Sequence, residues 1–222
     1  MDVKPLAVKA IAGLIGVGGV TGLTYHLTKS TSKTAKPEAV KNDMASRLTS
    51  EGYTLLSESS NNIDTILGSY KSIISSKNNL KFGEFGGVDV DGKKAKDELL
   101  KLCNSIFEET KNSNSYDKAI KWCIEPITAS EILKKQNITA LKTGTNADDD
   151  KAKWEDKIKK HIDSSNNLSK ISQLNLTSTA SQIVEGDYKI IQDKCDEIGK
   201  INNHTATFED SLKFFKLWCS DS

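Results

Sequence analysis

The feature that most constrains the fold of this chain is a Trp-Cys dipeptide that occurs twice, at positions 122–123 and 218–219. The 222-residue chain contains only three tryptophans and four cysteines, so chance does not readily produce two such pairs. Cys103 and Cys195 form another match, 92 residues apart, close to the 96 residues that separate the two dipeptides. The chain is therefore expected to contain two copies of one structural unit.

Further matches follow in the same order along the chain. Residues 46–56 match 130–141 at a spacing of 85 residues, and residues 115–117 match 207–209 at a spacing of 92. The spacing grows only at expected loops or by about one helical turn. Between these segments, a third match has a spacing of 88 residues: Ile66, Tyr70 and Ile73 match Trp154, Ile158 and His161. Chance similarity between lysine-rich helices is the alternative to a duplication.

Each unit is expected to be mainly helical, because apolar residues recur at intervals of three and four residues. Gly52 and Asn137 lie where a helix should end, since both residue types tolerate the left-handed conformation found there. Ser115 and Thr207 are candidate N-caps of the helix that ends each unit. The runs with helical spacing include Leu99, Leu102, Cys103 and Ile106, and Tyr188, Ile191, Cys195 and Ile198.

The segment 80–92 in the first unit does not follow this pattern. It is rich in glycine, and the alternation Val88-Asp89-Val90-Asp91-Gly92 predicts a loop or short hairpin inserted there. Asp89, Asp91, Gly92 and Glu98 also fit positions 3, 5, 6 and 12 of a calcium-binding EF-hand loop. Position 1 would be Gly87, which offers no side-chain oxygen. A plain Asp-Gly turn is the expected structure.

Residues 10–28 contain no Asp, Glu, Lys or Arg. Nineteen residues are about the minimum length for a helix that crosses a bilayer, so this run predicts a transmembrane signal anchor. A cleaved signal peptide is one alternative, although no Ala-x-Ala site follows. A buried soluble helix is another, although glycines would weaken it. The residues that define the expected anchor are Leu14, Ile15, Val17, Gly18, Gly22 and Leu23.

The expected organisation is therefore a tail at 1–9, the anchor at 10–28, a lysine-rich stalk at 29–45, and helical repeats at 46–125 and 126–222. The fold class is mainly α. The chain carries 31 Lys plus Arg residues against 30 Asp plus Glu residues. Such a balance argues against a nucleic-acid partner, which would select a basic surface.

The four cysteines carry the most informative chemistry. The chain has no Cys-x-x-Cys motif and no histidine at ligand spacing, so neither zinc nor a redox-active thiol pair is expected. Buried free thiols and disulfides remain. In a helical hairpin, residues equidistant from the turn face each other, which favours Cys103 with Cys123 and Cys195 with Cys219. Four cysteines allow three pairings, and sequence does not choose among them. Disulfides would place the repeats in an oxidising space outside the membrane.

Motifs that would indicate catalysis are incomplete. Residues 115–118 match Ser-x-x-Lys and residues 142–144 match Lys-Thr-Gly, but the third element of penicillin-binding enzymes is missing. The glycine-rich string at 16–22 lacks the third glycine and the preceding strand of a dinucleotide site. The chain is therefore not expected to be an enzyme, and we expect no catalytic residues, bound metal or cofactor.

Only Arg47 is an arginine, as expected of an AT-rich genome. The chain resembles the paralogous families of uncharacterised membrane-anchored proteins of haemotropic mycoplasmas. The resemblance implies a surface protein and variable antigen whose partners are the membrane bilayer and host-cell surface or immune components. It implies no activity for particular residues. The resemblance rests on the glycine-rich run from Ala12 to Gly22, Arg47-Leu48-Thr49-Ser50-Glu51-Gly52-Tyr53, Leu99 to Cys103, Lys121-Trp122-Cys123 and Trp218-Cys219.

The sequence favours a surface interaction protein whose C-terminal part is extracellular. Two other functional classes remain open. One is an exported ligand-binding module or enzyme, which would require a pocket with converging polar side chains. The other is an anchored scaffold that faces the cytoplasm, which would require reduced cysteines.

Overall fold

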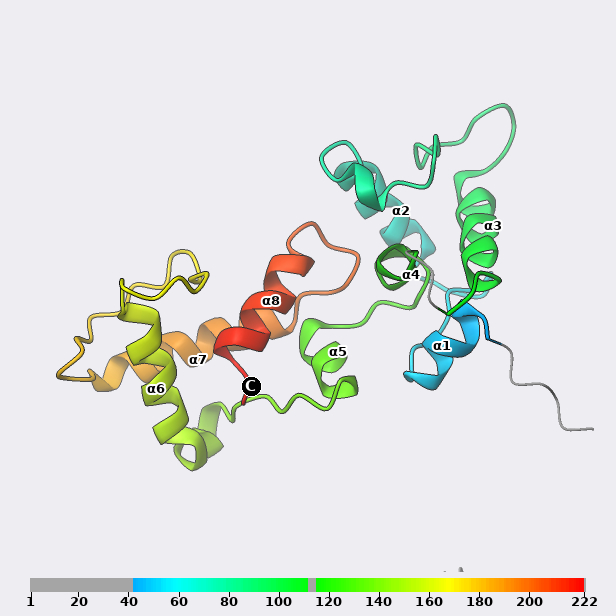
Figure 1. Cartoon of the computed structure of the whole chain (residues 1–222). Coiled ribbons are helices and arrows are strands. Elements are labelled where there is room, and N and C mark those ends of the chain that lie inside the picture. The colour runs from blue at the N-terminus through cyan, green and yellow to red at the C-terminus, as the bar shows by residue number, and fades with distance from the viewer. Residues whose placement is uncertain (1–41, 112–114, 222) are drawn as a thin grey trace, which may run out of the picture. The chain divides into compact units, whose positions relative to one another are not determined.

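The computed structural model in Figure 1 describes residues 42–111 and 115–221. These residues form eight α-helices and no β-strand, so the prediction of a mainly helical fold is confirmed. All of them belong to one compact unit. The helices of the first half are α1 (Met44–Ser50), α2 (Ile63–Ile73), α3 (Ala95–Phe107) and α4 (Tyr116–Trp122). Those of the second half are α5 (Ala129–Lys135), α6 (Lys151–Ile162), α7 (Glu185–Gly199) and α8 (Phe208–Trp218), and the 3₁₀ helices are η1 (Asn78–Leu80) and η2 (Gly144–Asp150).

The two halves, repeat 1 (α1 to α4) and repeat 2 (α5 to α8), close their last helix onto the first connection in the same way. In repeat 1 the Leu56 N–H donates to the Cys123 carbonyl at 2.8 Å. In repeat 2 the Leu141 N–H donates to the Cys219 carbonyl at 2.9 Å. One isolated β-bridge accompanies each bond, Leu55 with Ile124 and Ala140 with Ser220.

The first helix of each repeat is attached by a second shared contact. The Met44 N–H donates to the Glu109 carbonyl at 2.7 Å, and the Ala129 N–H donates to the Ile201 carbonyl at 2.9 Å. Both bonds join the start of the first helix to the segment after the third. Because these contacts recur in the same order, the duplication is present in the backbone as well as in the sequence.

The second helices match in a register that differs from the sequence comparison. The Tyr70 hydroxyl accepts the Phe82 N–H at 2.9 Å, and the His161 Nε2 accepts the Ile171 N–H at 3.1 Å. The Tyr70 ring lies edge-on to Trp122 at 5.1 Å between centroids, and the His161 ring lies likewise at 4.9 Å from Trp218. Tyr70 therefore corresponds to His161, and the earlier match of Tyr70 with Ile158 is wrong by nearly one helical turn.

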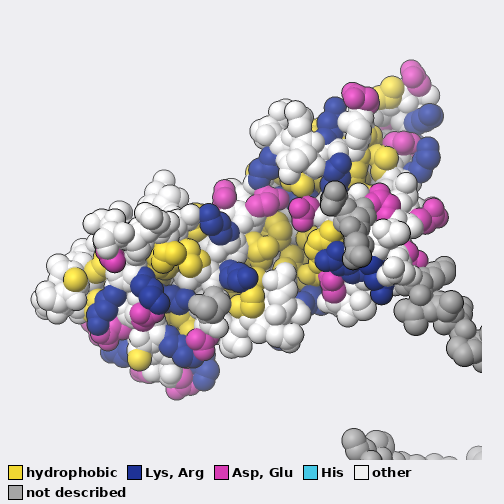
Figure 2. Space-filling view, viewed as in Figure 1, with side chains coloured by type: hydrophobic (Ala, Val, Ile, Leu, Met, Phe, Trp, Pro, Cys, Tyr) yellow, Lys and Arg dark blue, Asp and Glu magenta, His cyan; other side chains and the backbone are white. Residues whose placement is uncertain are grey.

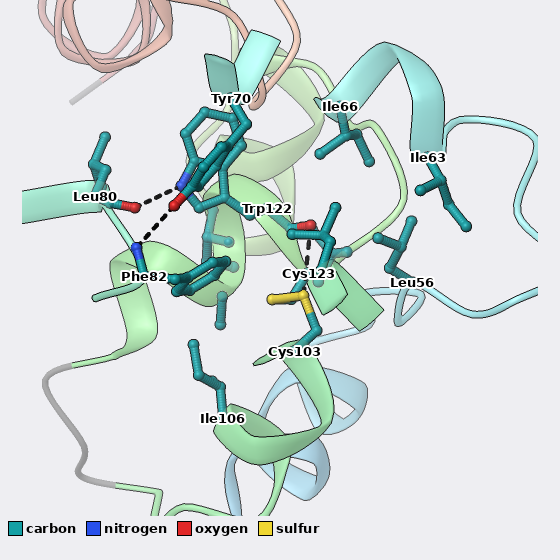
Figure 3. Packing of buried hydrophobic residues seen from close by; sticks show 14 of the residues in the cluster. Leu56, Ile63, Ile66, Tyr70, Leu80, Phe82, Cys103, Ile106, Trp122 and Cys123 are labelled. Carbon is teal, nitrogen blue, oxygen red and sulfur yellow. Dashed lines mark hydrogen bonds between the residues drawn. A yellow bond between two sulfur atoms is a disulfide. The ribbon is translucent and has the colours of Figure 1, made fainter. Parts of the chain in front are cut away.

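Each repeat has an apolar core around its buried terminal tryptophan. The Trp122 Nε1–H donates to the Leu80 carbonyl at 2.9 Å, as Figure 3 shows. The Trp218 Nε1–H donates to the Ser169 carbonyl at 2.8 Å. A buried indole needs such a partner, because an unpaired N–H away from water is costly. The bond thus fixes the connection between the second and third helices onto the core.

Local sequence signals explain where the elements end. Gly52 and Asn137 follow α1 and α5 with φ of 82° and 60°, which confirms the predicted left-handed helix ends. Ser115 and Thr207 immediately precede α4 and α8, but neither side chain makes the capping hydrogen bond. The helix starts are as predicted, while the side-chain caps are not.

The short hairpin predicted in the first repeat is present. Val90 and Lys93 exchange backbone hydrogen bonds around Asp91 and Gly92, whose φ values are 51° and 75°. Two consecutive positive φ values define the tight turn that Asp-Gly favours. The Asp89 Oδ1 accepts the Ala95 N–H at 2.7 Å, so this carboxylate holds the start of α3. Within residues 42–111 and 115–221, no group of three acidic, His or Cys side chains could hold a metal ion.

The residues of the expected membrane anchor lie outside the described part of the chain. In the described ranges, none of the helices combines the length and the apolar character needed to cross a bilayer. The anchor therefore stays a prediction from sequence for Leu14, Ile15, Val17, Gly18, Gly22 and Leu23.

The left-handed helix ends predict different effects of two exchanges on stability. We expect Gly52→Ala to lower the free energy of unfolding by about 1 kcal/mol, because a side chain at positive φ strains the backbone. We expect the matched exchange Asn137→Gly to change it by less than about 0.5 kcal/mol, because glycine relieves that strain. Urea denaturation followed by tryptophan fluorescence measures both. Equal losses in the two variants would contradict this account of the helix ends.

Candidate functional site

The four cysteines, for which the sequence favoured disulfides or buried thiols, form the disulfides Cys103–Cys123 and Cys195–Cys219. Each joins the third helix of a repeat to the C-terminal end of the fourth. Of the three possible pairings, this is the one that the helical-hairpin argument favours. All four residues are buried, which keeps the sulfurs away from thiol reductants. The disulfides are therefore structural crosslinks within the two cores.

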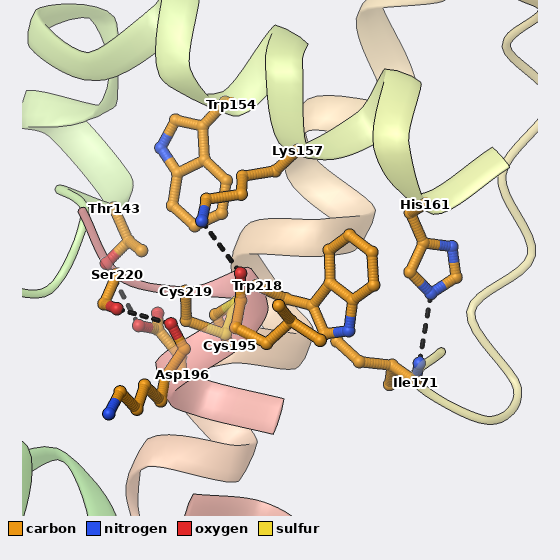
Figure 4. Close-up of a disulfide and its surroundings, with 12 residues drawn as sticks. Thr143, Trp154, Lys157, His161, Ile171, Cys195, Asp196, Trp218, Cys219 and Ser220 are labelled. Carbon is orange, nitrogen blue, oxygen red and sulfur yellow. Dashed lines mark hydrogen bonds between the residues drawn. A yellow bond between two sulfur atoms is a disulfide. The ribbon is translucent and has the colours of Figure 1, made fainter. Parts of the chain in front are cut away.

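The surroundings of the second disulfide, shown in Figure 4, are held by buried polar side chains. The Lys157 ammonium donates to the Leu217 carbonyl at 2.8 Å, and the Trp154 Nε1–H donates to the Lys142 carbonyl at 2.8 Å. Burial lowers the pKa of Lys157. Lys157 therefore ties α6 to the end of α8, Trp154 ties α6 to the segment before η2, and the two side chains do not converge on an open space.

A charged cluster joins the two repeats. The Lys121 Nζ on α4 donates to Glu209 on α8 and to the Thr205 carbonyl, both at 2.6 Å. The Lys77 Nζ donates to the other Glu209 oxygen at 2.6 Å. The Lys121 side chain is only 2% exposed, whereas that of Glu209 is 41% exposed. Burial therefore lowers the pKa of Lys121 despite its partner. Burial also raises the pKa of Glu209, but the bonds from Lys121 and Lys77 outweigh it and hold that pKa below its usual value.

The turn before α8 completes this contact between the repeats. The Asn203 Nδ2–H donates to the Ile120 carbonyl of repeat 1 at 2.6 Å. The neighbouring His204 is buried, and its Nδ1 has no hydrogen-bond partner among the described residues. Burial and then the charge of Lys121 lower the pKa of His204. A protonated His204 would add a second cation beside a buried ammonium group, so the contact favours neutral imidazole.

A groove on repeat 1 is the feature best suited to bind another molecule. It encloses about 610 Å³ between the segment 82–93 and α3, within the range of ligand sites. Its apolar lining consists of Phe82, Phe85, Val88, Val90, Leu102 and Ile106, and its charged side chains are Glu84, Asp91, Glu98, Glu109, Lys93 and Lys118.

The wall of this groove is held in place at several points. The Tyr70 hydroxyl donates to the Phe85 carbonyl at 3.1 Å and accepts the Phe82 N–H. Gly87 passes so close to Tyr70 that an added Cβ would lie 2.9 Å from its ring, at a φ of 74°. Asp89 ties the far end of the wall to α3. The groove is thus formed before any ligand arrives, which reduces the entropy lost on binding.

Two valines on this wall face solvent. Val88 is 51% exposed and Val90 is 56% exposed. The hairpin bridge of Val90 with Lys93 corresponds to the bridge of Thr179 with Gln182 in repeat 2, 89 residues later. The same spacing matches Val88 with Thr177. Repeat 2 makes the equivalent bridge with threonine, although its turn residues Ala180 and Ser181 lack the positive φ values of Asp91 and Gly92, so the bridge does not require valine at these positions.

Sequence reasoning located the hairpin but missed the groove. The available signal was the alternation at Val88, Asp89 and Val90, which places both valines on one side of an extended segment. What the sequence did not show is that this side meets α3 and leaves a hollow between them. The position of this segment depends on its hydrogen bonds to Tyr70, which belongs to α2 and not to the segment itself.

Comparisons with known proteins add no relative: no family model, no curated protein and no solved structure matches this chain.

Removal of either disulfide is predicted to lower the free energy of unfolding by a similar amount. We expect Cys103→Ala with Cys123→Ala, and separately Cys195→Ala with Cys219→Ala, each to lower the free energy of unfolding by about 3 kcal/mol. The reason is that the crosslinks close loops of similar length, with sequence separations of 20 and 24 residues. Denaturant titration measures the loss, and a non-reduced peptide map checks the pairing. Recovery of peptides that join Cys123 to Cys195 would contradict the structure.

The buried histidines predict a pH dependence of stability. Burial, followed by the charge of Lys170, lowers the pKa of His161, as burial and Lys121 do for His204. Below pH about 6.5 the unfolded chain takes up protons that the folded chain does not. The free energy of unfolding should therefore fall between pH 7 and 5, by at most about 1.4 kcal/mol per pH unit for each histidine.

The variant carrying His161→Gln and His204→Gln provides the control. It should show a much smaller fall over the same interval, because the carboxylates with lowered pKa values, Asp187 and Glu209, become protonated only at lower pH. Denaturation of both proteins at several pH values gives the comparison. The same slope in both proteins would assign the pH dependence to other groups.

Proposed function

We propose that this protein is a single-pass surface protein whose two disulfide-linked helical repeats form an extracellular interaction module without catalysis. The observation that carries the proposal is the pair of buried disulfides at equivalent places in the two repeats. Crosslinks of this kind form and persist in oxidising environments. The apolar run at 10–28 supplies a means of anchoring, and the resemblance to membrane-anchored mycoplasma proteins agrees with such a display.

The distribution of polar groups supports binding over chemistry. The buried titratable side chains Lys121, Lys157, His161 and His204 lie in the cores or between the repeats, outside the groove. The groove itself combines an apolar floor with charged edges, as binding surfaces do. A binding role thus uses the groove as it stands, whereas an enzyme would need reactive groups directed into it.

The way in which the helices are fixed also supports a role as a variable antigen. Backbone groups make the contacts that close both repeats, such as Leu56 with Cys123 and Leu141 with Cys219. These bonds do not depend on which side chains face solvent. A surface exposed to immune selection could therefore change in sequence while the fold persists.

Site-specific labelling of the full chain on intact cells tests the topology. We expect Ser72→Cys, an exposed position on α2, to react with a membrane-impermeant maleimide without reductant. The four native cysteines should react only after reduction and denaturation, because they are buried in disulfides. Mass spectrometry counts the labels.

The opposite result would favour the anchored cytoplasmic scaffold. In that case Ser72→Cys would react only after the membrane is opened, and the native cysteines would react in denaturant without any reductant. The parent chain without the added cysteine is the matched control for background labelling. That outcome would remove the surface-display proposal.

A further inference from the structure

We propose that the groove between the segment 82–93 and α3 binds an extended peptide in which apolar side chains alternate with lysine or arginine. The inference rests on the proposed function, because it assigns a site and a partner chemistry to the interaction module. It concerns repeat 1 alone.

The first argument is the spacing of the apolar side chains. Val88 and Val90 both line the groove, whereas the Asp89 carboxylate between them bonds to the Ala95 N–H at the start of α3. Over these three residues the side chains therefore alternate between the groove and α3. A partner peptide in an extended conformation presents every second side chain to the groove, which matches apolar residues to the valines and to Phe85.

The second argument is the charge around the groove. Four acidic side chains line it against two lysines. Glu84 and Glu98 have nearby lysines outside the lining, but the distances to Lys81 and Lys101 are 3.8 Å and one partner of each pair is largely exposed. Such exposed pairs are weak, so Glu84 and Glu98 stay available to a cationic ligand. Figure 2 shows hydrophobic side chains at the surface among acidic and basic ones over this part of the molecule.

The third argument is the comparison with repeat 2, which serves as an internal reference. There Thr177 and Thr179 take the places of the two valines, and Asp187 accepts the backbone N–H groups of Thr177 and Ser178 at 2.8 and 2.6 Å. The equivalent wall is thus polar and bonded to its own helix. At these two positions the exposed side chains are apolar in repeat 1 and polar in repeat 2, which indicates a property of this groove and not of the fold.

Fluorescence anisotropy with the full chain in mild detergent tests the proposal. The probe is a labelled seven-residue peptide of alternating lysine and valine. Two matched peptides replace lysine with glutamate, or valine with serine. We expect the lysine–valine peptide to bind at least about tenfold more tightly than either, because only it satisfies both the charge and the apolar lining.

Variants locate the binding. Val88→Thr with Val90→Thr copies the residues that repeat 2 already carries, so the fold should persist, and we expect about tenfold weaker binding. The matched control is Val184→Thr with Ile190→Thr, which removes two exposed apolar side chains of repeat 2 and should leave binding unchanged. Circular dichroism verifies that both variants stay folded.

Three outcomes would overturn the proposal. They are equal affinity for the three peptides, no binding at all, or equal weakening by the repeat 1 and repeat 2 variants. None of them would affect the labelling result on intact cells, so a failure of the groove and a failure of the surface-display proposal are distinguishable. Tight binding of the glutamate peptide alone would likewise overturn the proposal, because it would give the partner the opposite charge.

Discussion

The rest of each repeat depends on the buried Trp-Cys unit that ends its last helix. In repeat 1 the Trp122 indole holds the connection between α2 and α3 through the Leu80 carbonyl. The next residue, Cys123, is bonded to α3 through its sulfur, and its carbonyl holds the segment after α1. Two consecutive residues therefore attach the last helix to all the other parts of the repeat. Trp218 and Cys219 make the equivalent three attachments in repeat 2. The dipeptide recurs because both repeats use the same three attachments.

The features of this fold that could be predicted from sequence depend on residue types that occur in few structural environments. The Trp-Cys pairs revealed the duplication, and Gly52 and Asn137 revealed two helix ends, because few residues accept those environments. The register between α2 and α6 could not be predicted in the same way. Apolar positions recur at every helical turn, so a shift of three residues leaves a similar buried face. Only the hydrogen bonds of Tyr70 and His161, made to the segments that follow α2 and α6, distinguish the two registers.

The contact between the repeats shows why the candidate site was also beyond sequence reasoning. Tyr116 and Ile120 on α4 share a cavity with Phe208 and Leu212 on α8, and the two pairs are equivalent at a spacing of 92 residues. The repeats thus meet through matching faces. Among the described residues the ion pair of Lys121 with Glu209 has no counterpart, since the residue before the Trp-Cys dipeptide is Lys121 in repeat 1 but Leu217 in repeat 2. Like the groove, it arises from segments brought together by folding, and no local pattern announces it.

A duplicated chain separates what the fold needs from what it leaves free. Contacts present in both repeats, such as the indole bonds and the closing backbone bonds, are the requirements of the architecture. Val88 and Val90 belong to the other class, because threonine occupies the equivalent positions beside the matching bridge in repeat 2. An apolar side chain that is half exposed gains little stability from the fold and increases the tendency to associate. The architecture therefore offers no reason for the two valines, and a ligand that covers them does.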